Sequence, residues 1–160
     1  MRAAQRALKL LRENNQTLCC AESFTGGLMA NAIISSPNAS DVFLGSAVVY
    51  TEKAKHKVLN VPKKTLKSYG AVSSNTAAIL AKNARKLYNA DYALATTGFA
   101  GPTGDKIGLC FIGLSTKDNC LVYRINMNGT RNDIRKAATQ AAYKILINFM
   151  KGNNHGKKRL

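Results

Sequence analysis

The most constraining feature of the sequence is the stretch Ala21–Leu28, A-E-S-F-T-G-G-L, where a short apolar run gives way to a serine and two glycines. Leu18–Ala21 has the pattern of a buried strand, and Gly26 and Gly27 can expose backbone N–H groups at the start of a helix. Such a junction can hold an anion or an oxyanion, although the same turn is common as packing in α/β proteins. Ser23 is therefore a candidate nucleophile that needs partners from elsewhere in the chain.

Strand and helix patterns alternate along most of the chain. The expected elements, in order, are a helix over 2–14, a strand over 17–22, a helix over 26–35, a strand over 42–50, short helices over 51–59 and up to 70, a helix over 76–88, strands over 91–97, 107–115 and 120–126, and a helix from 130 to about 150. The segment T-K-D-N between the last two strands predicts a hairpin. We therefore predict a single-domain, three-layer α/β/α fold with a mixed, mainly parallel sheet and one antiparallel hairpin.

The length of 160 residues and the 46% hydrophobic content fit one domain with a sizeable core. We predict that this domain covers residues 1–151 and that residues 152–160 form a basic flexible tail. No run approaches the roughly 20 apolar residues that span a bilayer, and the first 12 residues interleave charge with apolar positions. The expected location is cytoplasmic, with no membrane contact.

Cysteine and histidine usage argues against a metal site. Cys19, Cys20 and Cys110 lie in strand-like stretches, and none of the four cysteines forms a C-x-x-C pair, so buried reduced thiols are expected. The chain has only two histidines, His56 and His155. A zinc site or a histidine-based catalytic triad is therefore not favoured. A thiol-dependent enzyme using the vicinal cysteines is the weakest of the readings, because no histidine partner is in view.

The formal net charge of +16 comes from 24 Lys and Arg residues against 8 Asp and Glu residues. Such a balance favours anionic partners, either a phosphorylated metabolite or nucleic acid, although solvated lysines explain much of it. Charge alone does not choose between these partners.

Three groups of residues that could take part in catalysis or binding follow predicted strands. Ser23 follows the first strand, Tyr50 ends the second, and Thr97 ends the third, before a turn that contains Gly98 and Gly101. Ligands in open α/β sheets gather outside the carboxyl ends of the strands, so we expect these groups to meet in one crevice. The glycine turn matches neither the Walker motif nor G-x-G-x-x-G, so no nucleotide triphosphate or dinucleotide is predicted.

With histidine nearly absent, the candidate base for the serine is a lysine with a lowered pKa. Lys53, Lys55 and Lys57 follow Tyr50, and their spacing alone does not decide among them. Tyr50 itself can relay a proton or orient the lysine, or simply pack at the rim of the crevice.

Other charged residues have two readings each. Glu22 follows an apolar strand, and bracing the turn fits it better than proton transfer. Arg131 and Arg135 are four residues apart at the start of the last helix and share a face, so they can grip a phosphate or simply contribute surface charge.

Several ordered motifs resemble those of the CinA C-terminal domain family over about Thr17–Phe149. The motifs are A-E-S-F-T-G-G, F-L-G-S-A-V-V-Y-T-E-K-A-K, G-A-V-S, A-D-Y-A-L-A-T-T-G-F-A-G-P and T-R-N-D-I-R. The resemblance implies a nicotinamide mononucleotide deamidase, which hydrolyses the carboxamide to nicotinate mononucleotide and ammonia in pyridine nucleotide recycling, without metal or cofactor. The expected partners are the pyridine mononucleotide and further copies of the chain in a homo-oligomer.

The resemblance also assigns roles to residues. It implies that Ser23 is the nucleophile, that Lys55 is its base and that Tyr50 belongs to the same catalytic pattern. We expect backbone N–H groups around Thr25–Gly27 to stabilise the oxyanion. The predicted substrate-binding residues are Glu22, Thr25, Gly26, Gly27, Thr97, Gly98, Gly101, Arg131 and Arg135.

The sequence departs from the family pattern at three places. Phe24 replaces a small residue after the serine, the connection Thr103–Lys106 is short, and Thr130 stands where an aspartate is usual. The alternative function is therefore a catalytically inactive paralogue that acts as a basic nucleic-acid or competence-related binding module. The chain contains no recognisable nucleic-acid-binding motif, which favours the enzymatic function over the binding module.

Overall fold

The structure is a computed structural model that describes the backbone of residues 3–157 and the side chains of residues 3–152. The described elements, in order, are α1 (Ala3–Glu13), β1 (Leu18–Glu22), α2 (Leu28–Ile34), η1 (Ala39–Asp41), β2 (Phe43–Val48), α3 (Glu52–Leu59), α4 (Lys63–Tyr69), α5 (Ser74–Tyr88), β3 (Tyr92–Gly98), β4 (Leu109–Ser115), β5 (Cys120–Asn126) and α6 (Arg131–Lys157).

One five-stranded sheet forms the middle layer, in the order β2-β1-β3-β4-β5. The strand β1 pairs parallel with β2 and β3, whereas β3 with β4 and β4 with β5 pair antiparallel. The predicted three-layer α/β fold and its β4–β5 hairpin are confirmed. The sheet has two parallel and two antiparallel strand pairings, so a larger share of the pairings is antiparallel than expected. The reason is that the chain turns back through the glycine loop after β3 and forms β4 antiparallel to it.

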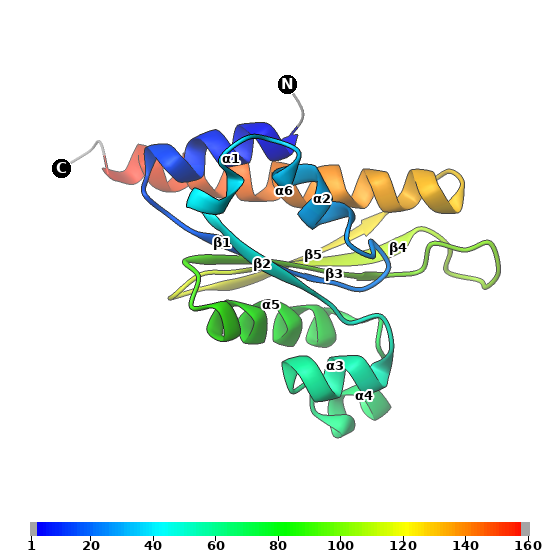
Figure 1. Ribbon diagram of the computed structural model, residues 1–160. Coiled ribbons are helices and arrows are strands. Elements are labelled where there is room, and N and C mark those ends of the chain that lie inside the picture. The colour runs from blue at the N-terminus through cyan, green and yellow to red at the C-terminus, as the bar shows by residue number, and fades with distance from the viewer. Residues whose placement is uncertain (1–2, 158–160) are drawn as a thin grey trace.

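Helices cover both faces of the sheet. In Figure 1, α1, α2 and α6 lie on one face, and α5 lies on the other with α3 and α4 at one end. The apolar face of α1, including Leu8 and Leu11, packs with Leu146 and Ile147 of α6 in the first core cluster. The second cluster joins Leu80 and other residues of α5 to the sheet. The strand β1 is buried along its whole length, as expected for an interior strand of a sheet that helices cover on both faces.

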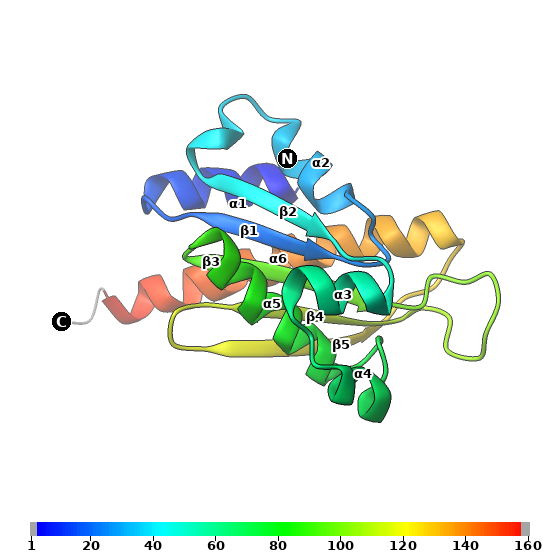
Figure 2. The ribbon, with the colours of Figure 1, turned by 60° about the horizontal axis from the view of Figure 1, so that its bottom comes forward.

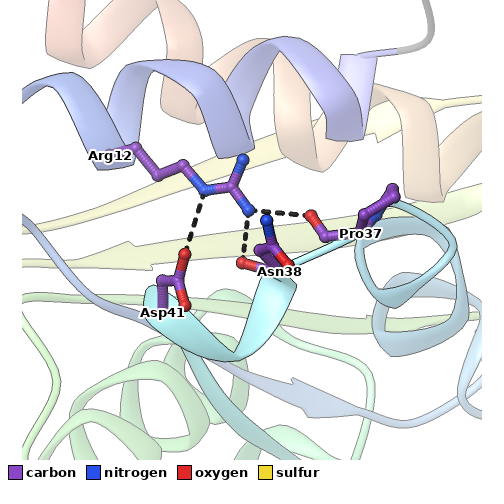
Figure 3. Close-up of polar contacts among 4 residues, drawn as sticks. All are labelled: Arg12, Pro37, Asn38 and Asp41. Atoms are coloured by element: carbon purple, nitrogen blue, oxygen red, sulfur yellow. Dashed lines mark hydrogen bonds and ion pairs between the residues drawn. The ribbon is translucent and has the colours of Figure 1, made fainter.

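Arg12 at the end of α1 ties this helix to the connection between α2 and β2 (Figure 3). Its guanidinium donates to the carbonyl oxygens of Pro37, at 2.7 Å, and Asn38, and its Nε lies 3.6 Å from an Asp41 carboxylate oxygen. Only one other ion pair, Lys9–Glu13, forms among the described residues, so few of the Lys and Arg side chains in that part of the chain have a direct acidic partner.

Several helix boundaries differ from the predictions, and two of the differences have a clear physical reason. The helix α2 begins at Leu28 rather than Gly26, because Gly26 and Gly27 have φ values of +58° and +95°, which an α-helix cannot contain. The helix α6 continues past Met150 to Lys157, since Gly152 and Gly156 weaken a helix without stopping it as proline would. The predicted tail residues 158–160 lie outside the described residues. No helix in the described range is long and apolar enough to cross a bilayer.

Candidate active site

The predicted crevice exists at the carboxyl ends of β1, β2 and β3. Figure 2 shows β1 and β2 pointing toward the same end of the sheet, next to α3. A cavity of about 340 Å³ lies there, within the usual size range of small-ligand sites. Its lining residues are Ser23, Phe24, Tyr50, Lys55, Ala71, Val72, Thr97, Gly98, Phe99, Ala100, Gly101, Thr103 and Arg131.

Ser23 and Lys55 lie in direct contact within this cavity. The Lys55 Nζ donates to Ser23 Oγ at 2.8 Å and to the Val49 carbonyl oxygen at 2.8 Å, and a longer bond of 3.4 Å reaches the Tyr50 carbonyl oxygen. A neutral amine has two N–H groups and one lone pair. If the two carbonyl groups hold the two N–H groups, the lone pair is directed at the serine hydroxyl, which is the arrangement that a general base requires.

The environment of Lys55 favours the neutral amine. Only 1% of the side chain is exposed, and this burial lowers its pKa from 10.5 to about 8, while the nearby Glu52 carboxylate acts in the opposite direction. An ammonium group loses hydration when it is buried, and the neutral form does not carry this penalty. An appreciable share of Lys55 is therefore uncharged near neutral pH.

The helical register of α3 explains which of the three lysines reaches the serine. Thr51 caps the helix by accepting from the Ala54 backbone N–H at 3.1 Å. Lys55 and Leu59, four residues apart, are the buried residues of the helix. Lys53 and Lys57 are exposed. The periodicity of a capped helix could have excluded the two exposed lysines, but only with the position of the sheet known.

Glu22 braces the turn and does not line the cavity. Its buried carboxylate accepts from three backbone N–H groups, of Gly27 at 2.9 Å and of Met29 and Ala30 at 3.0 Å each, and from the hydroxyl groups of Thr25 and Ser46. Five donors fill its acceptor positions, which agrees with the expected bracing role and leaves no free acceptor for the substrate contact also predicted for Glu22.

Protein acceptors occupy two of the three backbone N–H groups expected to bind an anion at Thr25–Gly27, those of Gly26 and Gly27. The N-terminus of α2 already holds an anion, the Glu22 carboxylate, and the Gly26 N–H donates to the Ser23 carbonyl oxygen at 3.1 Å. Thr25 is fully buried, with its hydroxyl between Glu22 and Thr96. Thr25, Gly26 and Gly27 thus shape the turn and are not among the residues that line the cavity.

Arg131 and Arg135 separate into different roles. The exposed Arg131 lines the cavity, where its guanidinium donates to the Gly101 carbonyl oxygen and, at 3.0 Å, to the Tyr50 hydroxyl. The Tyr50 side chain thus meets Arg131, and the Tyr50 backbone carbonyl meets Lys55. Arg135 instead binds backbone carbonyl oxygens behind the turn and does not line the cavity, so the predicted two-arginine phosphate grip does not form.

A family model described as the CinA C-terminal domain matches residues 1–150. The chain belongs to this family. It is 43% identical over 149 residues to a "Putative competence-damage inducible protein" of Thermoanaerobacter pseudethanolicus, covering 91% of this chain and 36% of that protein. A "CinA-like protein" of Endomicrobium trichonymphae is 41% identical over 86% of this chain and 33% of its own length. The chain thus spans about a third of the length of the curated relatives it matches.

Solved structures of CinA proteins have the same fold. The competence/damage inducible protein CihA of Agrobacterium tumefaciens superimposes with a TM-score of 0.87 at 33% identity, covering 91% of this chain and 92% of that one. A CinA superfamily protein of Klebsiella pneumoniae gives a TM-score of 0.91 at 25% identity, covering 94% and 96%. The CinA C-terminal domain is therefore supported by both sequence and architecture.

The residue that departs from the family pattern after the serine, Phe24, is accommodated by the core. Its side chain is 4% exposed and packs with Ala100, Cys110 and Ile134. A Cβ on Gly98 would lie 2.9 Å from the Phe24 ring, so glycine at this position leaves room for it. Thr130, the third departure, pairs with Asp133 at the start of α6.

Sequence reasoning missed the backbone groups of the site. The Val49 and Tyr50 carbonyl oxygens hold Lys55, and Thr97, which lines the cavity as predicted, donates to the Ala71 carbonyl oxygen at 2.7 Å. Backbone acceptors carry no residue-type signal, so only the pairing of β1 with β2 could have indicated them. The predicted buried thiols Cys19, Cys20 and Cys110 are confirmed as free and buried, and burial raises the pKa of Cys19 to about 12.

Proposed function

We propose that the protein is an amidohydrolase that converts nicotinamide mononucleotide to nicotinate mononucleotide and ammonia. The substrate comes from the resemblance of its motifs to CinA deamidases, and the chemistry rests on one observation, the 2.8 Å contact between Ser23 Oγ and the buried Lys55 amine at a cavity. A positioned base of lowered pKa is what a serine nucleophile needs.

In the proposed first step, the Ser23 hydroxyl transfers its proton to Lys55 Nζ as Oγ forms a bond with the carboxamide carbon. The carbonyl electron pair moves to oxygen and gives a tetrahedral oxyanion. When the C–N bond breaks, the Lys55 ammonium donates its proton to the departing nitrogen, which leaves as ammonia. Water, deprotonated by Lys55, then attacks the acyl-enzyme, and the proton returns to Ser23 Oγ as the nicotinate product forms.

The Phe24 N–H is the proposed oxyanion donor. It directly follows the nucleophile, Phe24 lines the cavity, and within the described part of the chain this N–H has no hydrogen-bond acceptor. The N–H after a nucleophilic serine serves this role in other serine hydrolases. Arg131, exposed at the cavity, is the proposed ligand of the substrate phosphate.

The test is ammonia release from nicotinamide mononucleotide by the wild type and the variants Ser23→Ala and Lys55→Met. Both variants are expected to lose at least about 10³-fold in kcat. Lys57→Met removes an exposed cation from the same helix and serves as the matched control, which should keep wild-type activity. Full activity of Ser23→Ala would exclude the covalent mechanism. Salt-sensitive DNA binding by a wild type that releases no ammonia would instead favour the basic binding module.

A further inference from the structure

Arg135 makes three hydrogen bonds behind the turn that carries the nucleophile. Its Nε donates to the Phe24 carbonyl oxygen at 2.8 Å, and one terminal nitrogen donates to the Thr25 carbonyl oxygen at 3.0 Å. The other terminal nitrogen donates to Asn132 Oδ1 at 3.1 Å. All three nitrogens of the guanidinium therefore have partners in the protein, and two of these partners are the carbonyl groups of the two residues that follow Ser23.

These contacts fix the orientation of the turn. In a planar trans peptide, the carbonyl and the N–H of the same group point in opposite directions. Because Arg135 draws in the Phe24 and Thr25 carbonyl groups, the Thr25 and Gly26 N–H groups point away from it, and the Gly26 N–H meets the Ser23 carbonyl oxygen at 3.1 Å. That last bond turns the Ser23 carbonyl inward, so the Phe24 N–H of the same peptide group is directed away from Gly26.

The opposite side of the turn is held by Glu22. The Thr25 hydroxyl donates to the Glu22 carboxylate at 2.9 Å, while the Thr25 carbonyl accepts from Arg135. Thr25 is thus held between an acidic and a basic side chain, which come from β1 and α6. Glycine at position 26 keeps this space open, since a Cβ there would lie 3.1 Å from the Arg135 terminal nitrogen.

We propose that Arg135 is a positioning residue of the proposed hydrolase: it holds the Ser23–Thr25 turn so that Ser23 Oγ faces Lys55 and the Phe24 N–H faces the developing oxyanion. This inference rests on the proposed function for its role in turnover. It replaces a phosphate-binding role for Arg135, because the guanidinium has no nitrogen without a protein partner and does not line the cavity.

The kinetic test compares Arg135→Lys and Arg135→Ala with the matched control Lys136→Gln. Lysine keeps the charge but lacks the planar fork that reaches two carbonyl groups. A loosened nucleophile and oxyanion donor lower turnover without weakening substrate binding, so kcat is expected to fall about 10²-fold in both variants while KM stays within about twofold. Added guanidinium ion at millimolar concentration should restore part of the kcat of Arg135→Ala. Lys136, exposed on the same helix, should be replaceable without loss.

A second readout does not depend on nicotinamide mononucleotide. The rate at which phenylmethylsulfonyl fluoride sulfonylates Ser23 with loss of fluoride, followed by intact mass, should fall at least about tenfold in both Arg135 variants, with Ser23→Ala as the unlabelled control. Slow labelling in these variants beside a wild type that labels rapidly but releases no ammonia would support the positioning role and reject the proposed substrate. Unchanged labelling and kcat, a raised KM with unchanged kcat, or no labelling of wild-type Ser23 would each overturn the positioning role.

Discussion

Raising the pH from 7 to 9 is expected to raise kcat/KM for nicotinamide mononucleotide about tenfold and then to level off. Burial lowers the pKa of Lys55 to about 8, so about one tenth of the free enzyme carries the neutral base at pH 7 and about nine tenths at pH 9. A lysine with the ordinary pKa of 10.5 would be neutral in only about 3 of 10⁴ molecules at pH 7. The local burial of Lys55 thus raises the population of the active form about 300-fold.

The assay is ammonia release at low substrate concentration between pH 7 and 10. The second pKa of a phosphate monoester is near 6, so the substrate charge is constant over this window. Glu52 raises the pKa of Lys55, and Glu52→Gln should therefore shift the midpoint to lower pH. The control Lys57→Met should keep the wild-type profile. A flat profile, or a rise of about 100-fold between pH 7 and 9 with no plateau, would refute the assignment of Lys55 as a base of lowered pKa.

Three further predictions concern stability, each measured by urea unfolding. Between pH 8 and 10.5 the folded state holds fewer protons on Lys55 than the unfolded state, so stability rises with pH there, and wild type should gain about 1 kcal/mol relative to Lys55→Met from pH 7 to pH 9. Gly108→Ala should cost at least about 2 kcal/mol, because its Cβ would lie 1.9 Å from the Met127 carbonyl oxygen, whereas Gly104→Ala, also at positive φ but in open space, should cost less. Glu22→Gln should cost about 2 kcal/mol or more, since an amide N–H₂ would face donors; an unchanged midpoint would argue against the bracing role.

The elements and the position of Ser23 between β1 and α2 could be predicted from the sequence, because periodicity, proline breaks and glycine turns are local signals. The crevice followed from the rule that ligands collect at the carboxyl ends of parallel strands. The antiparallel pairing of β4 with β3 was not predicted, since no local sequence signal tells whether a following strand pairs parallel or antiparallel with β3.

The bracing role of Glu22 was expected from its place after an apolar strand, but its five partners and the role of Arg135 could not be predicted, because they depend on which donors and acceptors are already paired. Arg135 contacts Thr25, which lies 110 positions earlier in the sequence, and the residues around either one do not indicate this contact. Arg131 and Arg135 share a helix face, as their spacing predicts, yet one reaches the cavity and the other the back of the turn. Helical spacing fixes the direction of a side chain but leaves its partner to the packing of distant elements.

The contact between Ser23 and Lys55 is a consequence of how β1 pairs with β2. The parallel register sets Glu22 opposite Val48, and just beyond it the Val49 N–H donates to the Glu22 carbonyl oxygen at 2.8 Å. The carbonyl oxygen of Val49 then accepts from Lys55 Nζ, which also contacts Ser23, the residue after Glu22. Ser23 and Lys55 are therefore joined by a closed path of short bonds through the adjacent strands β1 and β2. A slip of this pairing by one residue would exchange the two faces of the strand and separate the pair, so the same register that buries the core also sets the proposed chemistry.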